Sequence, residues 1–273
     1  MLRKFAAVLF LVSAVANSAG LPDPQDKVAF NNFNKVLTDF FIKDELESVK
    51  DGKKVLALED TYGPYSAEEM YRDYKRNELV ASNKYKGKKN RILGTVESVT
   101  ENFMGNAVVK TVNPNYFLGG AMLNVDKNDP YVLNLVPGSS LDMVCRGRGF
   151  VMDSPVLDKC VSTESYIHSQ FSSNAKTKKE IEGVTYLFYV PNEDILGKEC
   201  NTLTSCKELA SIFERMNKDD ITEDEKKKVI KMLMKHGVTK ASIDERKEKM
   251  KNFFEQYKVE LNKRFGLGKS LDW

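Results

Sequence analysis

Residues 66–99 read SAEEMYRDYKRNELVASNKYKGKKNRILGTVESV, and they carry the strongest signals of fold in the chain. Ser66 and Glu69 form a capping box, because the hydroxyl and the carboxylate can each satisfy a free backbone amide of the first helical turn. Apolar residues then recur on one face at helical spacing, namely Ala67, Met70, Tyr71, Tyr74 and Ala81. The sequence therefore predicts a helix over Ser66–Asn83, a turn containing Gly87, and a β-branched strand over Arg91–Val99.

Helix, turn and strand together resemble the start of the tRNA-anti-like family of OB-fold domains, which occur in bacterial envelope proteins. The matching residues, over about 66–161, are Asn77-Glu78, Ala81, Tyr85-Lys86-Gly87-Lys88, Gly94, Val96, Cys145-Arg146-Gly147, Leu157 and Cys160. The resemblance implies an α+β fold built on a small five-stranded OB-type β-barrel. It implies no particular chemistry, because the family is defined by its fold. Residues 112–123 depart from the family pattern.

Five strands are expected in this domain, which we place at residues 65–162. They are Asn90–Thr100, Ala107–Val112, Ala121–Val125, Ser140–Arg148 and Val156–Val161. Tyr131–Leu135 either extends the third strand or pairs separately. The apolar phase shifts between Val96 and Val99, which predicts the kind of bulge that bends a strand into a barrel. In the fourth strand, Asp142, Arg146 and Arg148 face away from the apolar side.

Helices are expected on both sides of this domain. Aromatic residues recur at helical spacing within residues 26–50, which predicts an amphipathic helix whose stripe is either core or a partner-binding face. Thr163–Gly183 is polar and indicates a loop, and Val184–Val190 indicates a strand. Three further capping boxes follow, at Ser205/Glu208, Thr222/Glu225 and Ser242/Glu245. Residues 184–273 are therefore predicted to form a strand and a C-terminal helical subdomain.

The first 19 residues are typical of a secretory signal peptide. Arg3 and Lys4 precede an apolar run and then small residues. Cleavage is expected near residues 16–19, before Asn17 or after Ser18. The apolar run is too short to span a bilayer, which takes about 20 residues, and we expect no membrane span elsewhere. The sequence thus predicts a periplasmic or secreted protein.

Charge and cysteine content narrow the class of partner. The chain has 42 basic and 39 acidic residues, and removing Arg3 and Lys4 leaves 40 against 39. This near balance differs from the basic excess of strong nucleic-acid binders.

The four cysteines form an even count in an exported chain and indicate two disulfides. Local spacing favours the pairs Cys145–Cys160 and Cys200–Cys206; a zinc site is the alternative, although the spacing matches no common ligand pattern.

Catalytic patterns are mostly missing from the sequence. His168 lies in a region expected to be a loop, and His236 precedes Gly237 at an expected helix end, where a cation is favoured by the helix dipole. We find no nucleophile elbow, zinc-protease motif or phosphate-binding glycine loop. We therefore expect no enzymatic activity, no catalytic residue, no cofactor and no metal.

Two segments are candidates for a binding surface. One is the basic cluster of Lys84, Lys86, Lys88, Lys89 and Arg91, and the other is the pair Tyr116 and Phe117 in the nearby excursion. Basic and aromatic residues together are typical of OB-folds that bind single strands, although such a charge run is often just a solvated turn. Lys86, Lys88, Arg91, Tyr116 and Phe117 are the possible binding residues.

Asn77 and Glu78 interrupt the apolar helix face. They are expected either to bond the backbone at the barrel end or to line a site. The sequence as a whole predicts a non-enzymatic, exported binding protein of the bacterial envelope, with a protein or small envelope ligand as partner. The alternatives are a module that binds single-stranded nucleic acid or oligosaccharide, or an envelope enzyme. Export makes nucleic acid the less favoured partner.

Overall fold

The computed structural model describes residues 20–102, 105–113, 120–216, 222–224, 227, 231, 234 and 240–267. The chain divides into two compact units, one formed by residues 44–172 and the other by residues 1–43 with 173–273. The predicted signal peptide, Tyr116, Phe117 and His236 lie outside the described residues. No described helix is both long and apolar enough to cross a membrane.

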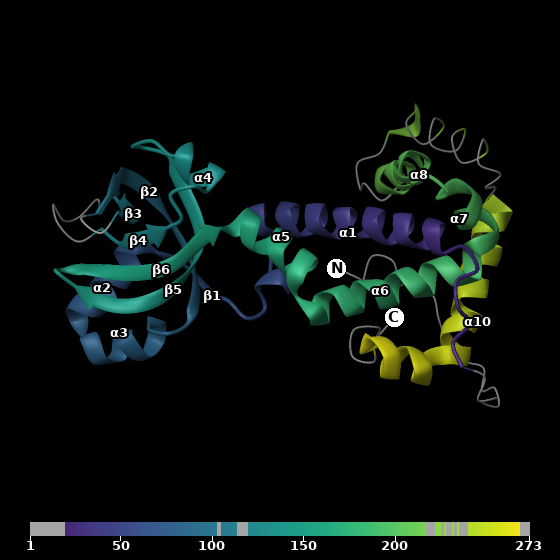
Figure 1. The fold of residues 1–273 in the computed structure, drawn as a ribbon, viewed down its shortest axis with the longest axis horizontal. Helices are drawn as coiled ribbons and strands as arrows, with labels where there is room; N and C mark the ends of the chain where they lie inside the picture. Colours follow the sequence, from purple (N-terminus) through teal and green to yellow (C-terminus); the bar gives the residue numbers. More distant parts are fainter. Residues whose placement is uncertain are drawn as a thin grey trace. The chain divides into compact units, whose positions relative to one another are not determined.

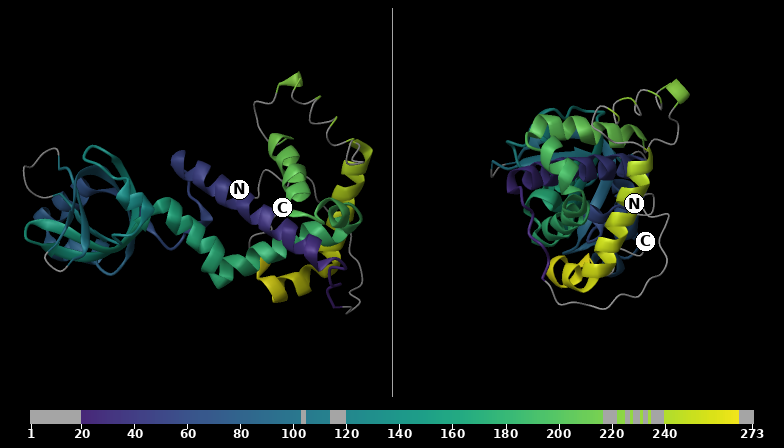
Figure 2. Two further views of the ribbon diagram at one scale, coloured as in Figure 1. Left: turned by 45° about the horizontal axis from the view of Figure 1, so that its top comes forward. Right: turned by 90° about the vertical axis from the view of Figure 1, so that its right-hand side faces the viewer.

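The first unit is a closed β-barrel with the strand order of an OB-fold (Figure 1). Its strands are β2 (Lys89–Glu101), β3 (Ala107–Thr111), β4 (Met122–Val125), β5 (Ser140–Val151) and β6 (Ser154–Ser162). The strands pair in the circuit β2–β3–β4–β6–β5, β5 returns to β2, and only the β4–β6 pairing is parallel. The ring is visible in the left view of Figure 2. A short strand, β1 (Tyr62–Ser66), pairs in parallel with the start of β2.

A bulge in β2 allows this strand to serve two partners. The register shifts between Val96 and Ser98, at the predicted phase change. Residues 89–95 pair with β5, whereas Val96 and the residues after the bulge pair with β3. The alternation expected in β5 is also present, because Leu141, Met143 and Cys145 are buried inside the barrel. The five-stranded barrel is therefore confirmed.

The helix expected over Ser66–Asn83 is two helices, α2 (Ala67–Arg76) and α3 (Glu78–Tyr85). The Ser66 hydroxyl accepts a hydrogen bond from the amide of Glu69, as a capping residue should. Asn77 is extended, and its side chain accepts from the amide of Val80 and so caps α3. Asn77 and Glu78 are exposed rather than set into an apolar face. Asn77 thus ends one helix and starts the next, which corrects the single-helix prediction.

The segment Tyr131–Leu135 is not a strand. It contains α4 (Pro130–Leu133), which Asp129 caps by accepting from the amide of Tyr131. Proline at the first helical position suits a helix, since the backbone nitrogen needs no hydrogen-bond partner there.

The β5–β6 hairpin turns at Met152 and Asp153, both with positive φ, as a two-residue turn of type I′ requires.

The second unit is helical. It contains α1 (Lys27–Lys50) up to Lys43, and also α6 (Ala175–Tyr189), η3 (Val190–Asn192), α7 (Glu193–Glu199), α8 (Leu203–Met216) and α10 (Lys240–Phe265). The aromatic stripe of α1 packs in its core; Phe30, for example, meets Tyr189 edge-on at a ring distance of 5.4 Å. Figure 1 shows α1 beside α6. The stripe is core rather than a free partner-binding face.

Two predictions between residues 163 and 190 are wrong. The expected loop Thr163–Gly183 is helical, since α5 (Thr163–Ser173) is followed by α6, and His168 therefore lies on a helix. The expected strand Val184–Val190 falls within α6 and η3. Its continuous apolar run is buried as part of a helix, and periodicity alone does not separate a buried strand from a buried helix. Asn174 caps α6 by accepting from the amides of Lys176 and Thr177.

The C-terminal helices also begin earlier than their capping patterns suggest. The hydroxyl of Thr202, not that of Ser205, receives an amide hydrogen bond at the start of α8, so this helix begins at Leu203. α10 begins at Lys240, before Ser242. Most of the helix expected after Thr222 lies outside the described residues.

Two pairs of cysteines lie at disulfide distance. The S–S distance is 2.09 Å for Cys145–Cys160 and 2.12 Å for Cys200–Cys206. The first pair joins the adjacent strands β5 and β6, and the second joins the end of α7 to α8. Both pairings are those predicted from local spacing.

Candidate functional site

The turn between α3 and β2 is fixed by two glycines. Gly87 adopts a left-handed conformation (φ +77°), and its amide donates to the carbonyl of Gly147 on β5 at 2.8 Å. The amide of Gly147 donates in return to the carbonyl of Lys88 at 3.0 Å. A Cβ on Gly147 would lie 2.2 Å from the carbonyl oxygen of Tyr85. The family-like motifs at residues 85–88 and 145–147 therefore form one joint between the helices and the barrel.

Buried polar groups complete this joint. Tyr85 is fully buried, and its hydroxyl donates to Asp73 on α2 at 2.7 Å. Asn90, also fully buried, donates from its side-chain amide to the carbonyls of Tyr85 and Lys88. Burial raises the pKa of Tyr85 above its ordinary value, and the neighbouring carboxylate of Asp73 adds to this effect. The role of Asn90 could not be predicted from the sequence, because a single asparagine at a strand start carries no pattern.

Most cations of the predicted basic cluster have a carboxylate partner. Lys84 contacts Glu69 and Asp73 at 2.9 Å each, and Lys89 contacts Asp60. Burial lowers the pKa of Lys84, but hydrogen bonds with Tyr85 and with the two carboxylates outweigh it, so that the pKa lies well above its ordinary value. Lys84 and Lys89 therefore form ion pairs within the barrel unit.

Arg91 is also engaged inside the unit. It is 9% exposed, and its guanidinium binds the carboxylate of Asp142 with two hydrogen bonds, at 2.9 and 2.7 Å. Lys88 is partly buried, and its ammonium lies 4.9 Å from the ring centre of Tyr62. Arg91 is therefore buried and bound to Asp142, and it does not belong to the exposed cations of the turn.

Three cations surround a hollow of about 430 Å³ on this side of the barrel. They are Lys86 from the turn and Arg146 and Arg148 from β5, and Gly87 and Gly147 complete the lining. In the described part of the chain, no carboxylate lies at ion-pair distance from Lys86 or Arg146. Arg148 lies 3.4 Å from Asp158. The two arginines were missed as site residues, although their outward position in β5 was a visible signal.

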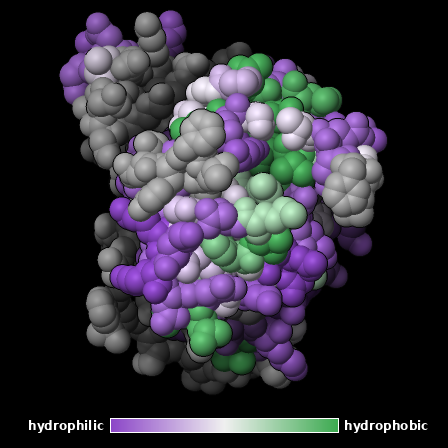
Figure 3. Space-filling view, turned by 90° about the vertical axis from the view of Figure 1, so that its left-hand side faces the viewer, coloured by the Kyte–Doolittle hydropathy of each residue, from purple (hydrophilic) through white to green (hydrophobic). Residues whose placement is uncertain are grey.

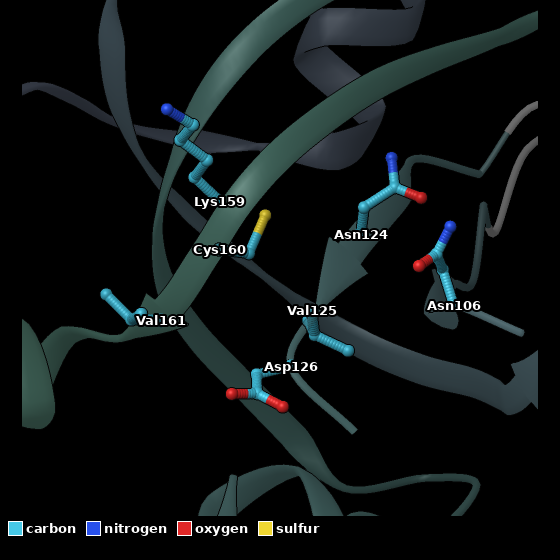
Figure 4. Close-up of a pocket in the computed structure, with 7 residues that line it drawn as sticks. All are labelled: Asn106, Asn124, Val125, Asp126, Lys159, Cys160 and Val161. Carbon is cyan, nitrogen blue, oxygen red and sulfur yellow. The ribbon is translucent and has the colours of Figure 1, made fainter. Parts of the chain in front are cut away.

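A second hollow, of about 380 Å³, lies beside β4 and β6 (Figure 4). Asn106 and Asn124 lie close together at one side of it, whereas Lys159 and Asp126 extend toward opposite ends of the view. Its charged groups therefore do not converge on one point. In the described residues, no three His, Cys, Asp or Glu side chains gather closely enough to hold a metal ion.

Figure 3 shows a space-filling view toward the barrel unit, seen from the left-hand side of Figure 1. Hydrophilic residues cover much of this face, and hydrophobic residues form patches among them. Leu79, Leu133 and Met152 are among the exposed apolar residues of the barrel unit. Exposed apolar residues are common on soluble domains, so the basic hollow is the more specific surface feature.

The strand circuit and the joint are those of an OB-fold barrel with added helices. A family model described as tRNA_anti-like matches residues 4–161, and the chain belongs to this family. The match extends N-terminally beyond the stretch that carries the resemblance in the sequence, and it includes α1.

One solved structure with partial similarity is a Klebsiella pneumoniae lipoprotein that is provisionally described as nucleic acid-binding. Sequence identity is 16% and the TM-score is 0.30; the match covers 36% of this chain and 89% of that one. No curated protein matches the chain.

Proposed function

We propose that this chain is an exported, non-enzymatic OB-fold protein of the bacterial envelope that binds its partner through a basic turn surface. We define this surface as Lys86, Lys88, Arg146 and Arg148. The observation that carries the proposal is the contrast in charge pairing: Lys84, Lys89 and Arg91 have carboxylate partners, and Lys86 and Arg146 have none in the described residues. Binding residues often lie on loops that a rigid scaffold holds in place, and the Gly87–Gly147 joint supplies such a scaffold.

Export is supported by two features. The first 19 residues have the charge and apolar pattern of a signal peptide, and all four cysteines are paired as expected in an oxidising compartment. Expression in a bacterium with fractionation and N-terminal sequencing tests this part. We expect periplasmic protein that begins near residues 17–20; full-length protein in the cytoplasm would contradict export.

The alternatives differ from the proposal in what they require. A single-strand binder needs aromatic residues beside the cations, and Tyr116 and Phe117 are candidates for a second contact element. Changing both to Ala should then weaken capture of a partner with little effect on thermal stability; unfolding would instead place them in the core. Turnover of a peptidoglycan, peptide or nucleotide substrate by pure protein would favour the enzyme alternative.

The binding proposal is tested by affinity capture. The mature wild-type chain and the double variant Lys86→Gln/Arg146→Gln are immobilised and exposed to envelope extract of the native organism. Lys54→Gln is the matched control, because Lys54 is exposed in the same unit and does not line the hollow. We expect wild type and control to retain the same component, with retention falling as salt rises. Equal retention by the double variant would refute the basic turn surface.

A further inference from the structure

The hollow beside the basic turn surface has a chemistry specific enough to name a ligand class. We propose that it binds a phosphate monoester carried on a polar body such as a sugar or polyol. This inference rests on the proposed function and specifies the ligand of the same surface.

The first argument is the local charge. Three cations line the hollow, and one carboxylate, that of Asp158, lies at ion-pair distance from one of them, Arg148. Arg146 faces Asp158 across the β5–β6 ladder, yet its guanidinium makes no ion pair with it. Lys86 and Arg146 thus remain uncompensated, so a ligand with close to two negative charges would balance the hollow. A phosphate monoester carries about −1.5 to −2 at pH 7, whereas a carboxylate or a phosphodiester carries about −1.

The second argument is the geometry of the donors. A guanidinium can bind two oxygens of one phosphate, and an ammonium acts as a point charge beside them. The backbone under Lys86 and Arg146 is fixed by the reciprocal hydrogen bonds across Gly87 and Gly147. Because the scaffold is ordered before a ligand arrives, little backbone entropy is lost on binding. The hollow is therefore lined by three exposed cationic side chains that project from an ordered backbone, which suits an anion with three free oxygens.

The third argument is the size and lining of the hollow. The hollow has a volume of about 430 Å³ and is open to solvent. A phosphate group has five heavy atoms and leaves most of that space to the rest of the ligand. The five residues that line the hollow include no aromatic side chain. None of these five residues can stack on a nucleobase, which favours a sugar or polyol as the attached body; the exposed ring of Tyr62 lies beside Lys88, outside this lining.

The test is a calorimetric titration of the full mature chain with two matched probes. Glucose 6-phosphate and glucuronate share a sugar ring and differ in carrying a phosphate or a carboxylate. We expect saturable binding of glucose 6-phosphate and at least roughly tenfold weaker binding of glucuronate. Vesicles that contain phosphatidic acid, compared with phosphatidylcholine vesicles, distinguish a lipid monoester from a soluble one; binding of these vesicles without binding of glucose 6-phosphate would contradict the polar body.

Variants assign the binding to this hollow. Lys86→Gln, Arg146→Gln and Arg148→Gln should each weaken glucose 6-phosphate binding by roughly tenfold, since each removes a charged hydrogen-bond donor. Lys54→Gln should leave it unchanged. Circular dichroism checks that each variant is folded.

Two outcomes would overturn the inference. Equal binding of both probes, or of neither, would refute the phosphate class, and binding that survives all three substitutions would refute the site. The capture experiment above remains independent of these outcomes. A chain that captures an envelope component through Lys86 and Arg146 but ignores glucose 6-phosphate would keep the proposed function and lose this ligand.

Discussion

Gly147 on β5 lies so close to Tyr85 that a Cβ at this position would meet the Tyr85 carbonyl oxygen at 2.2 Å. The same two segments are joined by reciprocal backbone hydrogen bonds through Gly87 and Lys88. The end of α3 and the middle of β5 therefore meet backbone to backbone. This contact brings the turn motif and the Cys-Arg-Gly motif together, and it places Lys86 beside Arg146.

Gly147→Ala should destabilise the barrel unit. The methyl group would collide with backbone atoms that cannot move without breaking the joint, and overpacking of this kind costs about 1–3 kcal/mol. Chemical denaturation measures the loss. Gly197→Ala on α7 is the matched control, because its new Cβ would find only ordinary contacts at 3.6 Å and beyond. Equal stability of the two variants would show that the joint is not as tight as described.

Arg91→Gln should reduce stability rather than binding. The substitution removes the two hydrogen bonds that the Arg91 guanidinium donates to the Asp142 carboxylate. Because the Asp142 side chain is 38% exposed, we expect a loss of about 1–3 kcal/mol, below the cost for a fully buried pair. Denaturation and the glucose 6-phosphate titration are run on the same sample. An unchanged free energy of unfolding together with weaker glucose 6-phosphate binding would instead show that Arg91 is part of the binding surface.

Glu45 should make the unit less stable as pH rises. It is 3% exposed, and burial raises the pKa of its carboxyl, although it accepts from the amides of Ala57 and Leu56. A folded-state pKa above the unfolded value gives a contribution that is full in acid and lost as pH rises through the folded pKa. The stability of wild type relative to Glu45→Gln should therefore fall as pH rises above the ordinary pKa of a glutamate, about 4.3. A difference that stays constant or grows would contradict this assignment.

Asp73 should show the opposite pH dependence. Burial raises its pKa, but hydrogen bonds from Lys84 and Tyr85 outweigh this and hold the pKa below its ordinary value. Its contribution is therefore present above the unfolded pKa and is lost as pH falls through the folded pKa. Asp73→Asn should cost about 1 kcal/mol at neutral pH and progressively less in acid, as measured by denaturation at several pH values. A cost that does not shrink in acid would argue against ionisation as the cause.

The sequence predicted the barrel because its signals there are local. The Ser66 cap, the β2 phase shift and the alternation of β5 each depend on neighbouring residues, and each is present in the structure. The apolar run at residues 184–190 failed as a signal because its helix is buried on several sides by α1 and α10. Tertiary packing, not local propensity, decides such a segment.

The candidate site was predictable only in part. The basic cluster drew attention to Lys86, but the cluster alone did not show which lysines have carboxylate partners. Arg146 and Arg148 join Lys86 only through the contact at Gly147, which lies about 60 residues along the chain from the turn. Pairing across that separation follows from the closed barrel and cannot be read from spacing.

The most direct test of the binding surface is an NMR map. Amide spectra of the mature, isotope-labelled chain are recorded during titration with the purified envelope component retained in the capture experiment. We predict that the largest shifts cluster at residues 86–88 and 146–148 and are lost in Lys86→Gln/Arg146→Gln. Shifts that cluster instead at residues 124–126 and 159–161, around the second hollow, would contradict the account.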